Sequence, residues 1–214
     1  HAASTYTVEI TPVSPTATDD AASTPFDTPV SVPVLDNDSA GADSAPLVPG
    51  SVKLIDPDSG DPVGSVAVPG EGTWTLGESG TVTFTPEDGF TGDTTPVTYR
   101  VADTNGTTAE AEGVVTVGAA PEANPDLRTT PQNIPVTETV LDNDAPGSGA
   151  TIDTTSVELF DGSTWGTSLT IDGEGVYSVN PSGTVTFTPE AQFTGTSSAP
   201  YRFTDSDGNQ AAST

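Results

Sequence analysis

The chain has 214 residues and a formal net charge of −27, from 31 acidic and 4 basic side chains, and it contains no cysteine. Such an acidic surface repels both the phosphate backbone of nucleic acids and anionic membranes, so we expect no nucleic-acid partner and regard anionic membrane surfaces as poor partners. Without cysteine, the chain forms neither disulfides nor cysteine-ligated metal sites. No stretch approaches the roughly 20 apolar residues that span a bilayer, so we expect no membrane insertion.

A long block of sequence occurs twice. The block GTVTFTPEDGFTGDTTPVTYRVADTNG at 80–106 recurs as GTVTFTPEAQFTGTSSAPYRFTDSDG at 183–208. The motif VLDND also occurs twice, within 32–38 and again within 138–144. Each repeat spans about 105 residues, which is long enough to bury a modest hydrophobic core. The chain is therefore predicted to be a tandem pair of one module.

The first predicted element is a strand within residues 1–12, where polar and apolar residues alternate over 5–10. This segment aligns with the end of the first module, and its AAST at 2–5 recurs at 211–214. We interpret 1–12 as the final strand of a preceding module and as a possible donor strand between subunits. Its inward-facing residues are predicted to be Tyr6, Val8 and Ile10, which align with Gly113, Val115 and Val117.

Residues 13–117 form the first predicted module. Short alternating runs and frequent glycine and proline, with no capped helical pattern, favour an antiparallel β-sandwich of immunoglobulin-like architecture. Pro33 cannot donate to a strand ladder, so we expect 30–34 to be an edge strand or a bulge. The predicted core residues are Val30, Val32, Val34, Val52, Leu54, Trp74, Leu76, Val82, Phe84, Phe90, Tyr99, Val101, Val115 and Val117.

Residues 118–126 are predicted to be a short, fairly stiff linker because they are polar and contain proline. The second module follows at 127–214 and is expected to lack its last strand. Glu138 occupies the position of Val32, so this strand is expected to be less buried or differently aimed. The fold class is thus two tandem immunoglobulin-like sandwiches, with an extra N-terminal strand and an incomplete C-terminal module.

Three motifs together carry a family resemblance: VLDND, then GTVTFTP followed by F-T-G, then Y-R-x-x-D-x-x-G. They resemble the CshA-type fibril repeat of large bacterial surface adhesins, over about 17–117 and 123–214. The resemblance implies an extracellular stalk or fibril on a bacterial cell surface. It also implies that adhesion to a host or matrix ligand is carried mostly by regions outside these repeats.

Oxygen-bearing side chains cluster at the module ends, and calcium prefers such hard oxygen ligands. Two interpretations stay open, because Asp and Asn before Gly also form tight turns and cap their own backbone. The candidate calcium ligands are Asp36, Asn37, Asp38, Asp103 and Asn105 in the first copy, and Asp142, Asn143, Asp144, Asp205 and Asp207 in the second. No other cofactor is indicated.

The sequence offers little for catalysis, so we predict that the chain is not an enzyme. His1 is the single histidine and there is no cysteine nucleophile. Lys53 alternates with apolar Val52 and Leu54 and is matched by Glu158 in the second copy, so we expect it to face solvent rather than form an isopeptide cross-link.

The favoured interpretation is a structural stalk whose partners are copies of itself. These join either as a head-to-tail filament, in which residues 1–12 complete the preceding subunit, or as a covalent tandem array. One alternative is an adhesion module that binds a host protein or glycan. Another is a spacer domain of a secreted enzyme.

Overall fold

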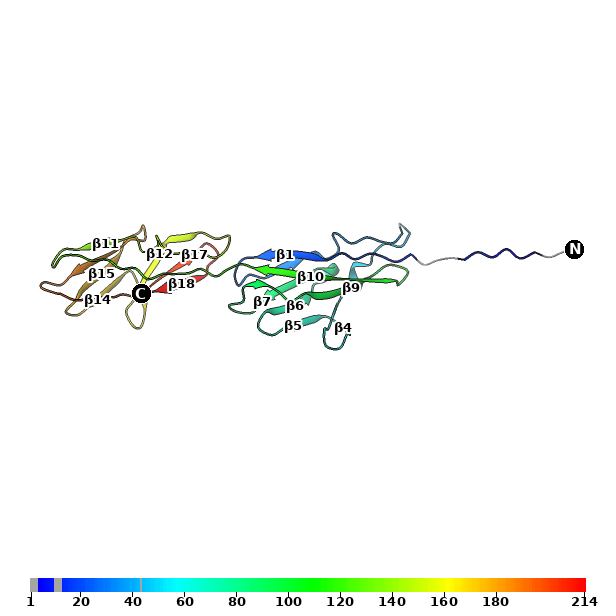
Figure 1. Cartoon of the computed structure of the whole chain (residues 1–214), viewed down its shortest axis with the longest axis horizontal. Helices are drawn as coiled ribbons and strands as arrows, with labels where there is room; N and C mark the ends of the chain where they lie inside the picture. Colours follow the sequence, from blue (N-terminus) through cyan, green and yellow to red (C-terminus); the bar gives the residue numbers. More distant parts are fainter. Residues whose placement is uncertain (1–3, 10–12, 43) are drawn as a thin grey trace. The chain divides into compact units, whose positions relative to one another are not determined.

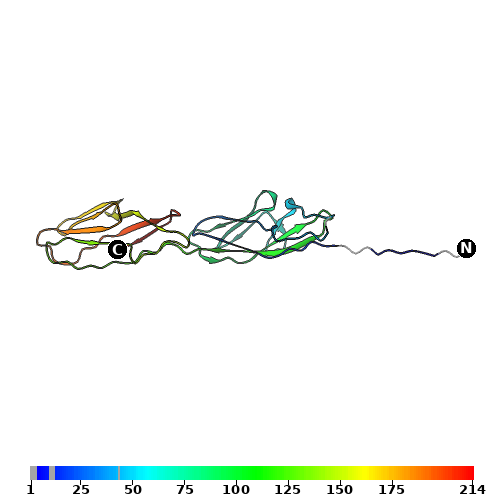
Figure 2. The same cartoon turned by 90° about the horizontal axis from the view of Figure 1, so that it is seen from above.

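The computed structural model describes residues 4–9, 13–42 and 44–214. It divides into two compact units, His1–Val117 and Gly118–Thr214, which we call unit 1 and unit 2. Both units are built from β-strands, as Figure 1 shows. Each is a sandwich of two sheets, as the alternating sequence predicts (Figures 1 and 2).

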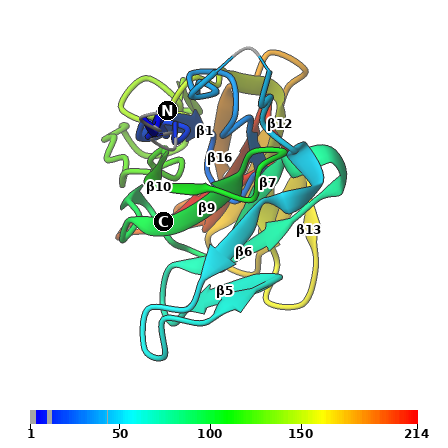
Figure 3. The same cartoon turned by 90° about the vertical axis from the view of Figure 1, so that its right-hand side faces the viewer.

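Unit 1 contains a six-stranded and a four-stranded sheet. The first has the order β1-β10-β9-β3-β4 with β8 also paired to β10, and the second has the order β2-β7-β6-β5. The strands β9 and β10 lie side by side in Figure 3. The strands of unit 1 are β1 (Asp20–Thr24), β2 (Val30–Val32), β3 (Lys53–Ile55), β4 (Pro62–Val63), β5 (Ser65–Val68), β6 (Gly72–Leu76), β7 (Val82–Pro86), β8 (Gly92–Asp93), β9 (Val97–Ala102) and β10 (Thr108–Val117), with two 3-10 turns at Pro49–Ser51 and Glu78–Gly80.

The core of unit 1 follows the period-2 pattern of its strands. Every second residue of β9 is buried, from Val97 to Val101, and the residues between them are partly exposed. The predicted core is confirmed: eleven of its fourteen side chains are buried, and Val30, Leu76 and Phe90 pack against them while partly exposed. Trp74 and Phe84 meet in the centre, with their rings 5.0 Å apart.

The first strands of unit 1 lie at sheet edges. β2 pairs only with β7, and Pro33 follows its last residue, so the predicted edge strand is confirmed. β1 pairs with the second half of β10, and the two strands run parallel, with Asp20 opposite Gly113 and Thr24 opposite Val117. The last strand of unit 1 is therefore held from both sides, by β9 along its first half and by β1 along its second half.

Unit 2 contains two four-stranded sheets, ordered β11-β16-β15-β14 and β13-β12-β17-β18. Its strands are β11 (Val136–Glu138), β12 (Ile152–Phe160), β13 (Trp165–Gly166), β14 (Ser168–Ile171), β15 (Gly175–Val179), β16 (Val185–Pro189), β17 (Tyr201–Asp205) and β18 (Gln210–Ser213). β18 pairs with β17 as the first half of β10 pairs with β9. In the described chain, 126–130 and 195–196 form no strand, although they are equivalent to β1 and β8.

Unit 2 buries a smaller core, centred on Phe203, Leu159 and Val157. Glu138 is partly buried and forms an ion pair with Arg128, where unit 1 has Val32 and Ala22. A charged pair thus occupies the positions of two apolar residues of unit 1.

The sequence places two segments outside the modules, the N-terminal segment and the linker, and the structure shows only the linker in contact with a module. Ser4–Glu9 pairs with no described strand and is exposed, while 1–3 and 10–12 lie outside the described residues. Residues 118–126 belong to unit 2, where Glu122 exchanges two backbone hydrogen bonds with Ala145. The predicted linker is thus partly fastened to the module that follows it.

Candidate functional site

The VLDND motif of unit 1 fastens the chain that leads into β1. Asn37 donates a hydrogen bond from its side-chain amide to the backbone oxygen of Asp19, at 3.0 Å. The backbone N–H of Thr18 donates to Asp38 Oδ1, at 2.8 Å. Asp36 is exposed on the turn itself. Two of the three predicted calcium ligands in this motif are therefore used to bind the backbone.

The same fastening recurs in unit 2. The Asn143 side chain donates to the backbone oxygen of Pro125 at 3.1 Å, and the backbone N–H of Asn124 donates to Asp144 Oδ1 at 2.7 Å. Asp142 is exposed. Because both copies use these residues in the same way, the motif has a structural role in each module.

A buried tyrosine completes this arrangement. The Tyr99 hydroxyl lies 3.0 Å from Asp38 Oδ1, and the Tyr201 hydroxyl lies 3.0 Å from Asp144 Oδ1. A hydroxyl bound to a carboxylate makes a strong, charge-assisted hydrogen bond. Each tyrosine therefore ties the central strand of one sheet to the VLDND turn, across about 60 residues of sequence.

A second carboxyl group lies beside each tyrosine, from Asp20 in unit 1 and Asp126 in unit 2. Burial raises the pKa of both carboxyl groups, and the neighbouring charge of Asp38 or Asp144 raises it further. Burial also raises the pKa of Tyr99 well above its usual value. In both carboxyl groups Oδ2 is buried and makes no hydrogen bond within the described structure. The ionised form of these groups therefore costs folding free energy.

The D-x-x-G motifs form self-capped turns. Asp103 Oδ1 accepts hydrogen bonds from the backbone N–H groups of Asn105 and Thr107, at 2.9 and 3.0 Å. The Thr107 hydroxyl donates to Asp103 Oδ2, which lowers the pKa of that carboxyl group. Asp205 accepts from the backbone N–H of Asp207 in the same way, at 3.0 Å. The turn interpretation accounts for all of these contacts.

Within the described residues, no group of three or more His, Cys, Asp or Glu side chains is arranged to hold a metal ion. The candidate ligands instead bind backbone N–H groups, backbone carbonyl oxygens or a tyrosine hydroxyl, or they are exposed. Calcium binding by them stays a prediction. A melting temperature that is the same in calcium and in chelator would contradict it.

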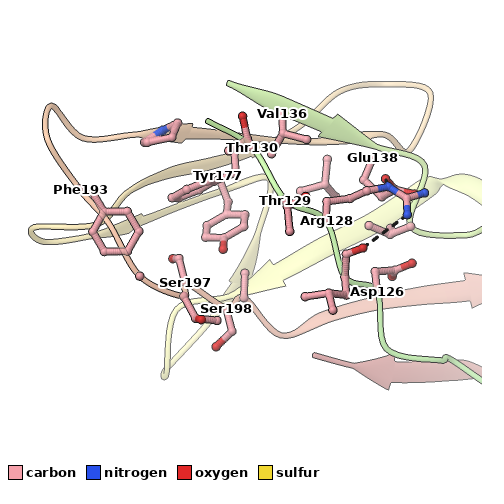
Figure 4. Close-up of a pocket in the computed structure, with 18 of the residues that line it drawn as sticks. Asp126, Arg128, Thr129, Thr130, Val136, Glu138, Tyr177, Phe193, Ser197 and Ser198 are labelled. Carbon is pink, nitrogen blue, oxygen red and sulfur yellow. Dashed lines mark hydrogen bonds and ion pairs between the residues drawn. The ribbon is translucent and has the colours of Figure 1, made fainter. Parts of the chain in front are cut away.

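A pocket of about 510 Å³ lies in unit 2 and is open beside 126–130. Its floor is apolar and comes from both sheets: Val136, Val140, Leu159, Tyr177, Val185 and Phe187. Its rim carries Asp126, Arg128 and the loop 194–199 (Figure 4). Tyr177 stacks on Phe187 with ring centroids 4.5 Å apart.

The equivalent place in unit 1 is filled by the second half of β10. Val115 and Val117 are 0% and 2% exposed there, between the two sheets. Thr94 exchanges two hydrogen bonds with the backbone of Val115: its N–H donates to Val115 O at 2.9 Å, and its Oγ1 accepts from Val115 N–H at 3.0 Å. The pocket of unit 2 thus corresponds to the seat of a strand in unit 1.

The predicted donor residues are accessible. Tyr6 is 92% exposed and Val8 is 60% exposed, although both are apolar or aromatic. Ile10 lies outside the described residues. An exposed alternating segment of this kind can pair with another strand.

The surface adhesin CshA repetitive domain matches the chain twice, at residues 12–117 and 118–214. The chain belongs to this family. Its two units are therefore two consecutive CshA repeats of a surface adhesin, and this membership points to a structural rather than an enzymatic role. A search of curated proteins found no match to this pair of CshA repeats.

Among solved structures, the eight-domain fragment of Down Syndrome Cell Adhesion Molecule is 12% identical to the chain, covers 93% of it and has a TM-score of 0.36. The four-domain fragment of Dscam1 isoform 4.4 is 14% identical over 96%, with a TM-score of 0.28. The chain spans 27% and 52% of these two fragments. Murine CEACAM1b is 16% identical over 92% of this chain and 96% of its own, with a TM-score of 0.28.

Among the described residues of the CshA repeats, no helix is long and apolar enough to cross a membrane.

Sequence reasoning found the VLDND and D-x-x-G motifs of the CshA repeats but not what they bind. The pairing of Asp20 with Tyr99, and of Asp126 with Tyr201, depends on contacts across some 75–79 residues. The signal that was available is that an aspartate and a tyrosine recur at matching positions in both copies. The lining of the pocket, with Ser197 as its buried polar group, had no comparable signal.

Proposed function

We propose that the chain is a structural stalk segment of an extracellular fibrillar adhesin, and that such segments join head to tail into a filament. The observation that carries this proposal is the double match to a surface adhesin repeat, which together covers residues 12–214. Two modules of the same fold in succession, with no other domain among residues 12–214, are what a spacer or fibre requires.

The side-chain hydrogen bonds within each module support a load-bearing role. In each unit, the segment that leads into β1 or into its counterpart 126–130 is fastened by the asparagine and the second aspartate of VLDND, and a buried tyrosine hydroxyl secures that aspartate. Side-chain hydrogen bonds of this kind resist the peeling of a first strand from the sheet edge. The large negative charge favours solubility and an extended, self-repelling array at low ionic strength.

The mode of joining that we propose is strand addition between subunits. The N-terminal segment of one subunit would complete the second unit of the subunit before it, as β10 completes unit 1. Exposed Tyr6 and Val8, and the open pocket of unit 2, are the observations that support this mode.

Purified chain tests the proposal directly. We expect size-exclusion chromatography with light scattering to show species whose mass rises with protein concentration, and electron microscopy to show thin filaments. A variant that lacks residues 1–12 should stay monomeric. The matched control is Thr7→Asp, which changes the outward face of the donor segment and should assemble as before.

Two results would count against the proposal. If the deletion variant assembles as the intact chain does, strand addition is wrong and another contact joins the subunits. If the intact chain remains monomeric at all concentrations, non-covalent head-to-tail joining is wrong.

A further inference from the structure

Two aromatic rings and an arginine meet on the outer face of one sheet of unit 2. Phe160 of β12 and Trp165 of β13 are directly opposite each other, and their ring centroids are 5.0 Å apart. The guanidinium carbon of Arg202, on β17, lies 4.6 Å from the centre of the Trp165 ring. Because the adjacent Leu159 and Phe203 are buried in the core, these three side chains lie on the solvent side of the sheet. We call Phe160, Trp165 and Arg202 the outer cluster; Figures 1 and 3 show its strands.

Unit 1 forms the same strands without this cluster. The counterparts of Phe160 and Trp165 are Ile55 and Pro62, which are also opposite each other in the register. Its arginine, Arg100, is paired with a glutamate of the neighbouring strand. The sheet therefore forms without aromatic rings at these positions. Partly exposed aromatic rings that the fold does not require are typical of binding surfaces.

Arg202 is held in place and still has hydrogen-bonding groups to offer. Its Nε and Nη2 donate to Glu158 Oε2 at 2.9 and 2.6 Å, and its Nη1 donates to Gln210 Oε1 at 3.2 Å. These bonds use three of the five N–H groups of a guanidinium. Its other N–H groups and Glu158 Oε1 have no partner within the described structure, and the two side chains are 25% and 34% exposed. A donor and an acceptor thus lie side by side next to the rings.

The indole ring is also held in position before any ligand binds. The turn that leads into Trp165 is capped by Asp161, whose Oδ1 accepts from the backbone N–H groups of Ser163 and Thr164 at 2.8 and 2.7 Å. The cation–π contact with Arg202 restrains the ring itself. A ligand that stacks here therefore loses little affinity to the ordering of protein side chains.

The charges around the outer cluster favour a neutral ligand. An anionic ligand is repelled by the net charge of −27. A cationic ligand competes with the guanidinium of Arg202 for the ring face and is repelled by its charge. A pyranose ring avoids both costs, because its C–H groups pack on the negative face of an aromatic ring and its hydroxyls both donate and accept hydrogen bonds.

We infer that the outer cluster binds a neutral glycan, with a pyranose ring on Trp165 and neighbouring sugar hydroxyls at Arg202 and Glu158. The hydroxyls accept from the free N–H groups of the guanidinium and donate to Glu158 Oε1. Such a site gives unit 2 a contact with neutral polysaccharide in addition to its role as a stalk segment. It does not depend on how the subunits join.

The fluorescence of Trp165 tests this inference on the intact chain. Trp74 is 1% exposed in the core of unit 1, so a soluble ligand acts on the emission through Trp165. The probes are neutral hexasaccharides of glucose, mannose or galactose, with hexagalacturonate as an anionic probe of equal length. We expect at least one neutral hexasaccharide to shift the emission in a saturable way and to protect Trp165 from quenching by acrylamide. Hexagalacturonate should do neither.

Variants assign the binding to the outer cluster, as followed by titration calorimetry. Trp165→Ala should weaken binding by roughly tenfold or more, because the stacking surface is lost. Arg202→Lys should weaken it by about threefold or more, because an ammonium lacks the planar fork that reaches two acceptors at once. The matched control is Val176→Ala, which removes a 38% exposed apolar side chain from the outer face of the other sheet and should bind as the intact chain does.

Four results would overturn the inference. The first is that no neutral hexasaccharide changes the emission or the quenching of the intact chain, a measurement that needs no variant. The second is that hexagalacturonate binds as tightly as the neutral probes, and the third is that Trp165→Ala binds as the intact chain does. The fourth is an emission that changes with protein concentration alone, which would make the outer cluster a contact between copies of the chain.

Discussion

The buried hydroxyl of Tyr99 is expected to be a main energetic support of unit 1. It lies 3.0 Å from the Asp38 carboxylate, and Tyr99 is only 1% exposed. A hydrogen bond to a charged group contributes about 1.5–3 kcal/mol, so we expect Tyr99→Phe to lower the free energy of unfolding by about 2 kcal/mol. This is a large part of the roughly 5–15 kcal/mol that stabilises a typical domain.

Urea unfolding measures this loss. A Trp165→Phe background leaves Trp74 as the single tryptophan, so its fluorescence reports unit 1 alone. With a slope of about 1–3 kcal/mol per M, the midpoint should fall by roughly 1 M while the slope stays constant. A double-mutant cycle that combines Tyr99→Phe with Asp38→Asn should give a coupling energy of about 1 kcal/mol or more, because the hydroxyl and the carboxylate are in direct contact.

The pH dependence refines the test. Burial raises the pKa of Asp20, which lies beside the same hydroxyl. Once Asp20 is protonated, its carboxyl O–H can donate a hydrogen bond to Asp38 in place of the tyrosine hydroxyl. The cost of Tyr99→Phe should therefore be smaller near pH 4 than at pH 7. A coupling energy under about 0.3 kcal/mol, or a cost that grows as the pH falls, would refute this reasoning.

Three further predictions concern other parts of the two units. Phe84→Ala should cost about 3–5 kcal/mol by urea unfolding, because Phe84 is 0% exposed and its ring lies 5.0 Å from that of Trp74. Asp126→Asn should raise the melting temperature of unit 2 at pH 7, because burial raises the pKa of Asp126 and its ionised form destabilises the fold above that pKa; the gain should shrink as the pH falls toward the raised pKa. Gly72→Ala should destabilise unit 1 by about 2 kcal/mol or more in calorimetry, because a Cβ there would lie 2.3 Å from the backbone oxygen of Thr85 and the residue has a φ of +152°.

Most of the fold of unit 1 could be predicted from sequence because its strands are half buried. Alternation along 81–85 and 97–101 identifies the inward side chains without knowledge of which strands pair. The same reasoning predicted a strand at 5–10, but a strand exists only with a partner, and the described part of this segment has none within the chain. The alternation of polar and apolar residues does not show which strand, if any, will pair with this segment.

The candidate calcium residues show a second limit of prediction from sequence. Their composition is equally suited to metal ligands and to turns, and the sequence left both open. The distinction depends on what lies opposite each oxygen: the backbone N–H of Thr18 and the hydroxyl of Tyr99 beside Asp38, and the N–H groups of a tight turn beside Asp103. The partners of Asp38 come together only when the module folds, whereas those of Asp103 lie within four residues of it.

The sequence by itself determined the repeat, the β-sandwich class, the family and the inward face of most strands, because each depends on order and period along the chain. Only the tertiary structure decided that Asp20, Asp38 and Tyr99 share one buried site, and that Val115 and Val117 are enclosed between the two sheets of unit 1. Those features depend on contacts between residues far apart in sequence, and on volumes that are defined only after the two sheets have packed.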